Sequence, residues 1–487
     1  MPNSYRLRII NAAAIIAALF AAIAMPVSIL RHGYLPDDDV FYHAANAVSG
    51  KQWNQIIVVR NDVELDPQIG WHTFLKAVRE YASLNEVGLV KFCIVSLFAL
   101  FCAAPLFLVR RPEAWLLALI AMSLCHDGDF YLFDRLMRGR PYIITTAVIL
   151  VIGLVWPKLQ DKKNASRVAG LLVLPIAIAT YLHGSWYLFA LPIACLFLSQ
   201  QRQAGAMLLW TTLLGIAMGA VFTGHPVIFL GQTFRHIYRV FGYTSLYRVL
   251  TPELRAGVIN PLTLVTLFFM LSWRRFRQSR NPPISQDPVF VLMAVSMLLG
   301  CVVRRFWFDL GRPALLIWLC LEFQEYLESK LGAESYKRVF LAMFLAVALH
   351  TYVAADVENR WSNNHPAMPL TPADPELAQW MPEDGGIFYC DTMTLFDTTF
   401  FNFPRGNWRY ILGTEPGLMP DEDLAIYRNI MATSRSVYSF IPWANKLRPQ
   451  DRLVVADASD KIRQYIPNLE WHDTHRSVWI GRLPRNR

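Results

Sequence analysis

The chain alternates long apolar runs with short polar loops over residues 1–355. About eleven of these runs approach the roughly 20 residues that an α-helix needs to cross a bilayer. The pattern therefore predicts an all-α polytopic membrane bundle of about eleven transmembrane helices. The expected helices cover residues 9–30, 87–109, 113–126, 141–157, 168–183, 184–199, 204–222, 258–273, 288–303, 314–328 and 338–355.

Residues 356–487 follow a different pattern, in which four closely spaced prolines precede short apolar runs and polar stretches. This is typical of a small soluble α/β domain. Residues 421–432 are expected to form a helix, because acidic side chains occupy its first turn. The expected strands are 386–390, 452–456 and 477–480.

Composition and charge support a membrane protein. The chain is 54% hydrophobic and 17% charged, with a mean hydropathy of +0.30, which is outside the range of ordinary soluble domains. Residues 1–355 hold 32 Lys and Arg against 20 Asp and Glu, whereas residues 356–487 hold 14 against 17. The basic surplus therefore belongs to the membrane part, which disfavours a nucleic-acid partner.

The cationic loops predict the orientation, because loops rich in Lys and Arg stay in the cytoplasm. We expect a cytoplasmic N-terminus in a plasma membrane, most simply a bacterial inner membrane. The soluble domain is then extracytoplasmic, and residues 31–86 form the first outer loop. The loops assigned to the cytoplasm contain Arg6 and Arg8, Arg110 and Arg111, residues 158–167, Arg202, residues 273–280, and the basic residues around Lys337.

An acidic cluster opens the first outer loop, where Asp37, Asp38 and Asp39 follow the first apolar run within a few residues. Adjacent carboxylates repel one another unless a cation, an Arg or a proton compensates them. Such a cluster can supply a general base or bind a divalent metal. The alternative is a solvated acidic loop without a chemical role.

A second acidic pair, Asp127 and Asp129, lies between the third and fourth expected helices. A turn at Gly128 would aim both carboxylates at one ion. Together with Asp37 and Asp39 this pair is a candidate site for Mg²⁺ or Mn²⁺.

Two outward loops carry arginines, against the orientation rule that the other loops follow. Guanidinium groups bind phosphate oxygens in pairs, so these loops predict an anionic partner such as a lipid phosphate. The alternative is a structural network in which the arginines neutralise nearby carboxylates. The candidate phosphate-binding residues are Arg135, Arg138, Arg140, Arg304, Arg305 and Arg312.

The outward segment 226–250 mixes aromatic and aliphatic residues with Arg235 and Arg239. These two arginines are four residues apart and share one helical face. The segment is expected to form an interfacial helix, either to cradle a polyprenyl chain or simply to contact membrane lipids.

In its arrangement the chain resembles the GT-C superfamily of integral-membrane glycosyltransferases, which includes oligosaccharyltransferases, protein mannosyltransferases and aminoarabinose transferases. Asp38-Asp39-Val40-Phe41-Tyr42 stands where that superfamily has an acidic motif followed by aromatic residues. Asp127 and Asp129 match a second acidic element after the third span, and the soluble tail also fits the pattern. A WWD-type acceptor motif is absent from the tail, which disfavours peptide N-glycosylation.

The resemblance implies transfer of a sugar from a polyprenyl-phosphate or polyprenyl-pyrophosphate carrier to an acceptor outside the cytoplasm. It implies that Asp38 or Asp39 is the general base, and that the outward arginines hold the donor phosphate. Two other functions stay open: a transporter or flippase of lipid-linked saccharide, and a membrane assembly factor with a binding tail. The absence of an evident internal repeat disfavours the transporter.

Overall fold

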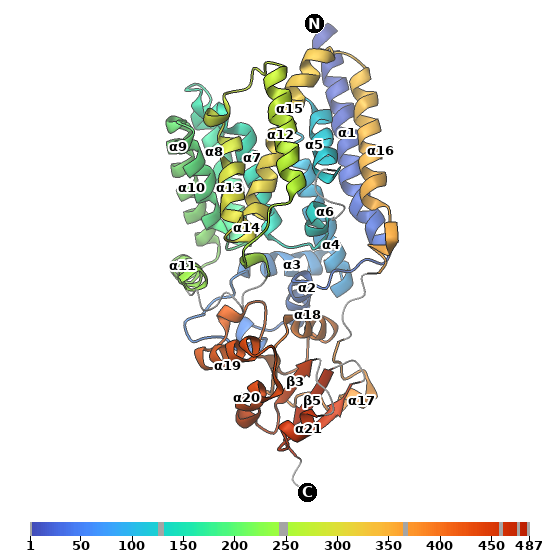
Figure 1. Ribbon diagram of the computed structural model, residues 1–487, viewed down its shortest axis with the longest axis vertical. Helices are drawn as coiled ribbons and strands as arrows, with labels where there is room; N and C mark the ends of the chain where they lie inside the picture. Colours follow the sequence, from blue (N-terminus) through green and yellow to red (C-terminus); the bar gives the residue numbers. More distant parts are fainter. Residues whose placement is uncertain are drawn as a thin grey trace. The chain divides into compact units, whose positions relative to one another are not determined.

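The computed structural model describes residues 2–124, 131–242, 252–363, 369–456, 461–474 and 478–484. The chain divides into two compact units (Figure 1). Unit 1 comprises Met1–Tyr34, Lys91–Gly224 and Glu253–Asn364. Unit 2 comprises Leu35–Val90, His225–Pro252 and His365–Arg487. The first outer loop therefore belongs to the same unit as the C-terminal tail, and the border near the tail lies at 364/365, compared with the expected 355/356.

Six helices of the described chain are long and apolar enough to cross a membrane. This identifies a multi-pass membrane protein, as the hydropathy pattern predicted. Helices α1 and α16 lie side by side in unit 1 (Figure 1), as do α8 and α10. The six are α1 (Pro2–Arg31), α4 (Glu86–Ala103), α7 (Tyr142–Gln160), α8 (Ala165–Leu182), α10 (Arg202–Phe222) and α16 (Lys337–Ala354).

The expected count of about eleven spans is wrong for the described residues. The other five apolar segments do form helices, but four are too short for a bilayer and α15 carries Arg312, Glu322 and Glu325 along its length. Three of these five helices begin at a proline, which fits the first turn of a helix but not its interior, and one ends at Gly300. The five are α5 (Pro112–Leu124), α9 (Ala190–Leu198) after η2 (Trp186–Phe189), α12 (Pro261–Phe276), α13 (Pro288–Gly300) and α15 (Arg312–Lys330).

Side-chain caps fix where two of these helices begin. Asn260 accepts a hydrogen bond from the N–H of Leu262 at the start of α12. Asp287 accepts from the N–H groups of Val289 and Phe290 at the start of α13. In each case a proline follows the cap, where its missing N–H costs no helical hydrogen bond.

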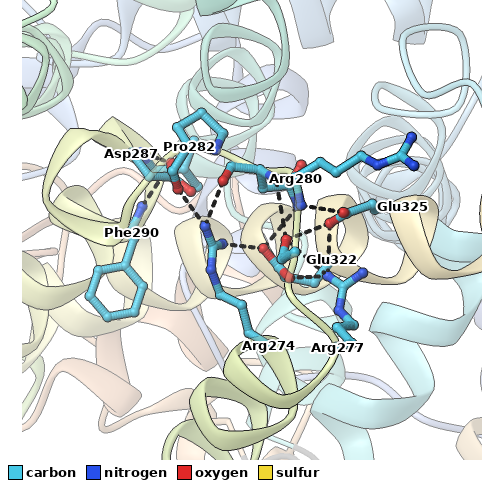
Figure 2. A network of polar contacts seen from close by, with 11 residues as sticks. Arg274, Arg277, Arg280, Pro282, Asp287, Phe290, Glu322 and Glu325 are labelled. Carbon is cyan, nitrogen blue, oxygen red and sulfur yellow. Dashed lines mark hydrogen bonds and ion pairs between the residues drawn. The ribbon is translucent and has the colours of Figure 1, made fainter.

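A buried ion-pair cluster in unit 1 contains two arginines of the 273–280 loop (Figure 2). The sequence indicated for this loop only a cytoplasmic location. The fully buried Glu322 on α15 forms ion pairs with Arg274 and Arg277 from the end of α12, and accepts from Asn281 Nδ2 at 2.9 Å. These ion pairs join the end of α12 to α15. Removing one partner would leave an uncompensated buried charge, so the contact is expected to stabilise the fold.

A second buried cluster has the same construction. Glu113, at the start of α5, is fully buried, and its Oε1 lies 2.7 Å from Arg338 Nε and 3.5 Å from Arg111 Nη1. Arg338 also donates to the backbone carbonyl of Ala333. The beginning of α16 is thereby fastened to the beginning of α5.

Unit 2 contains a five-stranded sheet in the order β2-β1-β3-β5-β4. The first three strands in this order are parallel, and β3, β5 and β4 are antiparallel neighbours. The expected strands and the helix at 421–432 are confirmed, with α19 covering Asp421–Ala432. The strands are β1 (Ile387–Tyr389), β2 (Arg409–Tyr410), β3 (Arg452–Ala456), β4 (Glu470–Asp473) and β5 (Val478–Arg482).

The first outer loop is built into this domain. Residues on either side of Ile57 extend the sheet beyond β2: Val58 donates to the carbonyl of Tyr410 at 2.9 Å, and the N–H of Tyr410 donates to Ile56 at 3.0 Å. Helix α2 (Val40–Ser49) packs on α18 (Met393–Asn402), where Phe41 stacks on Phe401 with ring centroids 4.3 Å apart. One hydrophobic core therefore includes both segments.

The remaining elements are short or amphipathic. Those of unit 1 are α6 (Tyr131–Met137), η4 (Pro252–Leu254, which begins on the last residue of unit 2), η5 (Ile284–Gln286), α14 (Arg304–Phe306), η6 (Trp307–Gly311) and η7 (Val357–Asn359). Those of unit 2 are η1 (Trp53–Gln55), α3 (Ile69–Ala82), α11 (Pro226–Gly242), α17 (Pro375–Ala378), η8 (Pro416–Leu418), η9 (Val437–Phe440), α20 (Ile441–Lys446) and α21 (Ile462–Tyr465).

Candidate functional site

Three of the candidate arginines converge on two carboxylates in unit 1. Arg135 on α6 donates from Nη1 to Glu253 Oε1 at 2.9 Å and from Nη2 to Asp309 Oδ1 at 2.6 Å. Arg140 shares the same Glu253 oxygen at 3.1 Å, and Arg305 binds the other oxygen of Asp309 at 2.8 Å. We call these five residues, together with Arg312, the arginine cluster.

Arg312 joins the cluster through an aromatic ring. The guanidinium carbons of Arg135 and Arg312 lie 4.9 Å and 4.3 Å from the ring centroid of Phe308. Both arginines also line a small cavity whose other walls are mostly apolar, including Phe101 and Ile143. Cationic donors therefore lie beside a small, mostly apolar space.

A π-helical turn sets the positions of these side chains. Residues Trp307–Gly311 form the π-helix η6, which runs directly into α15. The wider turn directs Asp309 inward, where only 1% of it is exposed. Glycine at position 311 allows this packing, because a Cβ there would lie 2.2 Å from the Trp307 ring. Single π-turns within helices occur frequently at functional sites.

The electrostatics of the cluster favour full ionisation. Burial alone would raise the pKa of Glu253, but the charges of Arg135 and Arg140 outweigh burial and hold this pKa well below its usual range. Burial opposes the charge of Arg305, and Asp309 reverses that effect, so the pKa of Arg305 is raised. Glu253 and Arg305 are therefore charged in the folded cluster.

The other two candidate arginines have different surroundings. Arg138 binds Asp134 one helical turn away at 2.9 Å, and both side chains are about one-third exposed. Arg304 lies 5.9 Å from the Phe308 ring. Glu253 was missed in the sequence, because nothing in its local pattern indicates a partner 118 residues away in Arg135.

The acidic motif of the first outer loop forms the start of α2 in unit 2. The carbonyls of Asp38 and Asp39 accept from the N–H groups of Phe41 and His43. The Asp38 carboxylate accepts from the N–H of Asp39 at 2.6 Å and is buried, whereas Asp39 is half-buried. The Asp38 side chain therefore shapes the turn, and the Asp39 side chain is the more accessible of the two.

Several carboxylates influence Tyr42, one helical turn into α2. Burial raises the pKa of its phenol well above the usual value, and the negative charges of Asp39, Asp66 and Asp397 raise it further. The phenol donates a hydrogen bond to Gln68 Oε1. Tyr42 therefore stays neutral among acidic groups that come from both the outer loop and the tail.

A buried chain of hydrogen bonds extends from this region. His43 Nδ1 lies 2.8 Å from His72 Nε2, and the other ring nitrogen of His72 binds Asp66. Both histidines are buried, at 0% and 3% exposure. Asp66 fixes the orientation of His72, which in turn fixes His43, as an acid does for histidine in many catalytic sites. Sequence reasoning found nothing specific in residues 61–72, because this contact depends on the pairing of α2 with α3.

The predicted metal set is described only in part. Asp127 and Asp129 lie outside the described residues. Within the described ranges, no group of three or more His, Cys, Asp or Glu side chains is placed to hold a metal ion. Of the predicted ligands, the structure describes Asp37 and Asp39.

No protein-family model matches the chain, and no curated protein is significantly similar to it. The candidate carboxylates belong to unit 2 and the arginine cluster belongs to unit 1.

Proposed function

We propose that this protein is a membrane glycosyltransferase of the GT-C type that uses a polyprenyl-phosphate or polyprenyl-pyrophosphate sugar as its donor. The observation that carries the proposal is the arginine cluster, in which Arg135, Arg140 and Arg305 bind Glu253 and Asp309. Arg312 lies over the Phe308 ring in the same cluster, beside a small, mostly apolar cavity. Buried ionisable groups in a membrane protein are costly and often mark a ligand site. A lipid phosphate has the required charge and depth.

The proposed transfer needs a base for the acceptor and a cationic group for the leaving phosphate. A base takes the proton of the acceptor nucleophile, the nucleophile forms a bond to the anomeric carbon, and the bond from that carbon to the phosphate oxygen breaks. The leaving carrier phosphate gains negative charge, which preorganised guanidinium groups stabilise. A carboxylate is a suitable base for this step.

We assign the base to Asp39 and a positioning role to Asp38. The Asp38 carboxylate is engaged with the backbone of its neighbour, while Asp39 is more accessible. Replacement of Asp38 by Asn would keep an oxygen that accepts from the Asp39 N–H. Asp38→Asn and Asp39→Asn are therefore both expected to fold. Asp39→Asn is expected to lose the sugar transfer.

The orientation of the cationic loops favours unit 2 lying outside the cytoplasm, where a polyprenyl donor would present its sugar to an extracytoplasmic acceptor. A flippase of lipid-linked saccharide would also need cations for the phosphate. It would move the lipid without breaking the bond between sugar and phosphate, so the chemical state of the carrier distinguishes the two functions.

The experiment begins with a deletion strain whose envelope glycans are compared with those of the parent by mass spectrometry. The wild-type gene should restore the lost glycan, and Asp39→Asn should not. Glu80→Gln is the matched control, because Glu80 is an exposed carboxylate on α3 in the same unit. Full restoration of the glycan by Asp39→Asn at wild-type protein levels would contradict the assignment of Asp39 as the base. An unchanged glycan profile in the deletion strain would contradict the proposed function.

A further inference from the structure

Helix α11 (Pro226–Gly242) in unit 2 has two faces of different character. Phe229, Gln232 and His236 recur at the spacing of one helical face, and Phe229 and Gln232 are buried. Val227, Phe234 and Tyr238 recur on the opposite face, where they are 83%, 64% and 72% exposed. A soluble protein rarely leaves three large apolar side chains together on one exposed helical face.

The buried face is fastened to the rest of unit 2 by specific polar contacts. Gln232 Oε1 accepts from the N–H groups of Glu64 and Leu65 at 3.0 Å and 3.1 Å, and its Nε2 donates to the Leu65 carbonyl at 2.7 Å. His236 Nε2 lies 2.6 Å from a carboxylate oxygen of Glu415. The helix therefore has a fixed rotation, and its apolar face points away from the domain that holds it.

Further ion pairs reinforce this rotation. Arg239 pairs with Asp421 at the start of α19, and Arg235 lies 3.8 Å from Asp62. Burial lowers the pKa of His236, but the charge of Glu415 outweighs burial and raises it, which favours the charged pair. These contacts reach both the first outer loop and the tail, so α11 holds the two segments of unit 2 at once.

The short connection between α10 and α11 indicates what lies against the exposed face. Helix α10 ends at Phe222 and α11 begins at Pro226, so three residues separate α11 from a helix that is long and apolar enough to cross the membrane. The four Cα–Cα steps from Phe222 to Pro226 reach about 14 Å at most. The beginning of α11 is therefore held close to the end of a membrane span, at the depth of the lipid headgroups.

We infer that α11 is an interfacial helix that lies along the bilayer surface and anchors unit 2 to it. The exposed apolar face contacts the boundary between lipid headgroups and acyl chains, and Val227, Phe234 and Tyr238 insert there. Arg235 borders this face and is 52% exposed on its side chain, a position from which a long cationic side chain reaches lipid phosphates. This inference is independent of the proposed sugar transfer.

The test uses the full chain in vesicles of phosphatidylcholine and phosphatidylglycerol. Single cysteines replace Val227, Phe234 and Tyr238 in a Cys125→Ser, Cys301→Ser background, and each carries an environment-sensitive fluorophore. Lipids with a spin label near the headgroup quench probes at that depth, and iodide quenches probes in water. Gln464→Cys and Asn468→Cys are the controls, because both positions are exposed and polar within unit 2.

The three α11 probes should be quenched about twofold or more by the labelled lipid and little by iodide, with the reverse for the controls. Quenching of the α11 probes by iodide alone would place the face in water and overturn the inference. Protection from both quenchers would mean that protein covers the face, which also overturns it. Should one variant fail to fold, Gly231→Cys probes the same face, since a Cβ there meets no atom within 4 Å.

Discussion

Arg135 and Asp309 lie 174 residues apart in the sequence, and a 2.6 Å hydrogen bond joins them inside unit 1. Each has a second partner: Arg135 also holds Glu253, and Asp309 also holds Arg305. The pair therefore links α6, η4 and the π-helical turn before α15. This network holds these three elements rigidly together.

The first prediction concerns Asp309→Ala, which removes the central anion of the cluster. Two buried guanidinium groups would lose their shared partner, and breaking a buried pair from one side costs about 3–5 kcal/mol. The apparent unfolding temperature of the detergent-purified protein should fall sharply. Asp134→Ala is the control, since its pair with Arg138 is partly exposed and contributes at most about 1 kcal/mol. Equal losses in the two variants would contradict a central role for Asp309.

The second prediction concerns binding of a polyprenyl phosphate, measured by native mass spectrometry of the purified protein. Arg305→Gln leaves Asp309 paired with Arg135, so the fold should persist while the site loses one cation. We expect affinity to fall about tenfold, the equivalent of about 1.4 kcal/mol. Arg138→Gln should change affinity less, because Arg138 lies against Asp134. A larger effect at Arg138 than at Arg305 would move the phosphate site away from the cluster.

The third prediction concerns the buried hydrogen-bond chain of unit 2. Asp66→Ala leaves His72 Nδ1 without the acceptor it has now, and an unsatisfied buried polar group costs about 1–3 kcal/mol. Asp66→Asn keeps an amide oxygen as acceptor and should cost less. Thermal unfolding of both variants measures the difference. If the alanine and asparagine variants unfold together, the hydrogen bond to His72 contributes nothing to the fold.

The fourth prediction is a pH dependence at Asp287 in unit 1 (Figure 2). Burial raises the pKa of this carboxyl to about 6, despite the hydrogen bonds it accepts from Phe290 and Val289. The folded state therefore retains the proton better than the unfolded state. Stability from this group is complete below about pH 4 and is lost as the pH rises through about 6.

Asp287→Asn keeps the helix cap and removes the ionisation. At pH 7 the variant should be more stable than the wild type, by as much as about 3 kcal/mol at about 1.4 kcal/mol for each pKa unit. At pH 4 the two proteins should unfold alike. Melting curves at the two pH values provide the measurement, and a variant that is less stable at pH 7 would show that the carboxylate is favourable where it lies.

Local patterns in the sequence predicted local structure well. The helix at 421–432 and the strand at 452–456 are where the sequence indicated, because acidic residues in a first turn and an apolar run between polar residues act over a few positions. The spans were overcounted for the same reason: apolar composition marks buried segments, but several of these runs form helices too short to cross a bilayer.

Contacts between distant segments could not be predicted from one sequence. The pairing of Val58 with Tyr410, which builds the first outer loop into the tail, has no local signal. The same holds for Glu253 in the arginine cluster and for His72 beside His43. The arginines could be selected from the sequence, because their loops depart from a local charge rule that the other loops follow.

The central claim is that the protein breaks the bond between a sugar and a polyprenyl phosphate. The most direct measurement incubates the purified chain in vesicles with polyprenyl-linked saccharides and an extract of envelope acceptors, and quantifies free polyprenyl phosphate or pyrophosphate by mass spectrometry. The wild type should release the carrier with transfer of the sugar, and Asp39→Asn should not. Movement of intact lipid-linked saccharide across the vesicle membrane, without release of the carrier, would contradict the claim and favour a flippase.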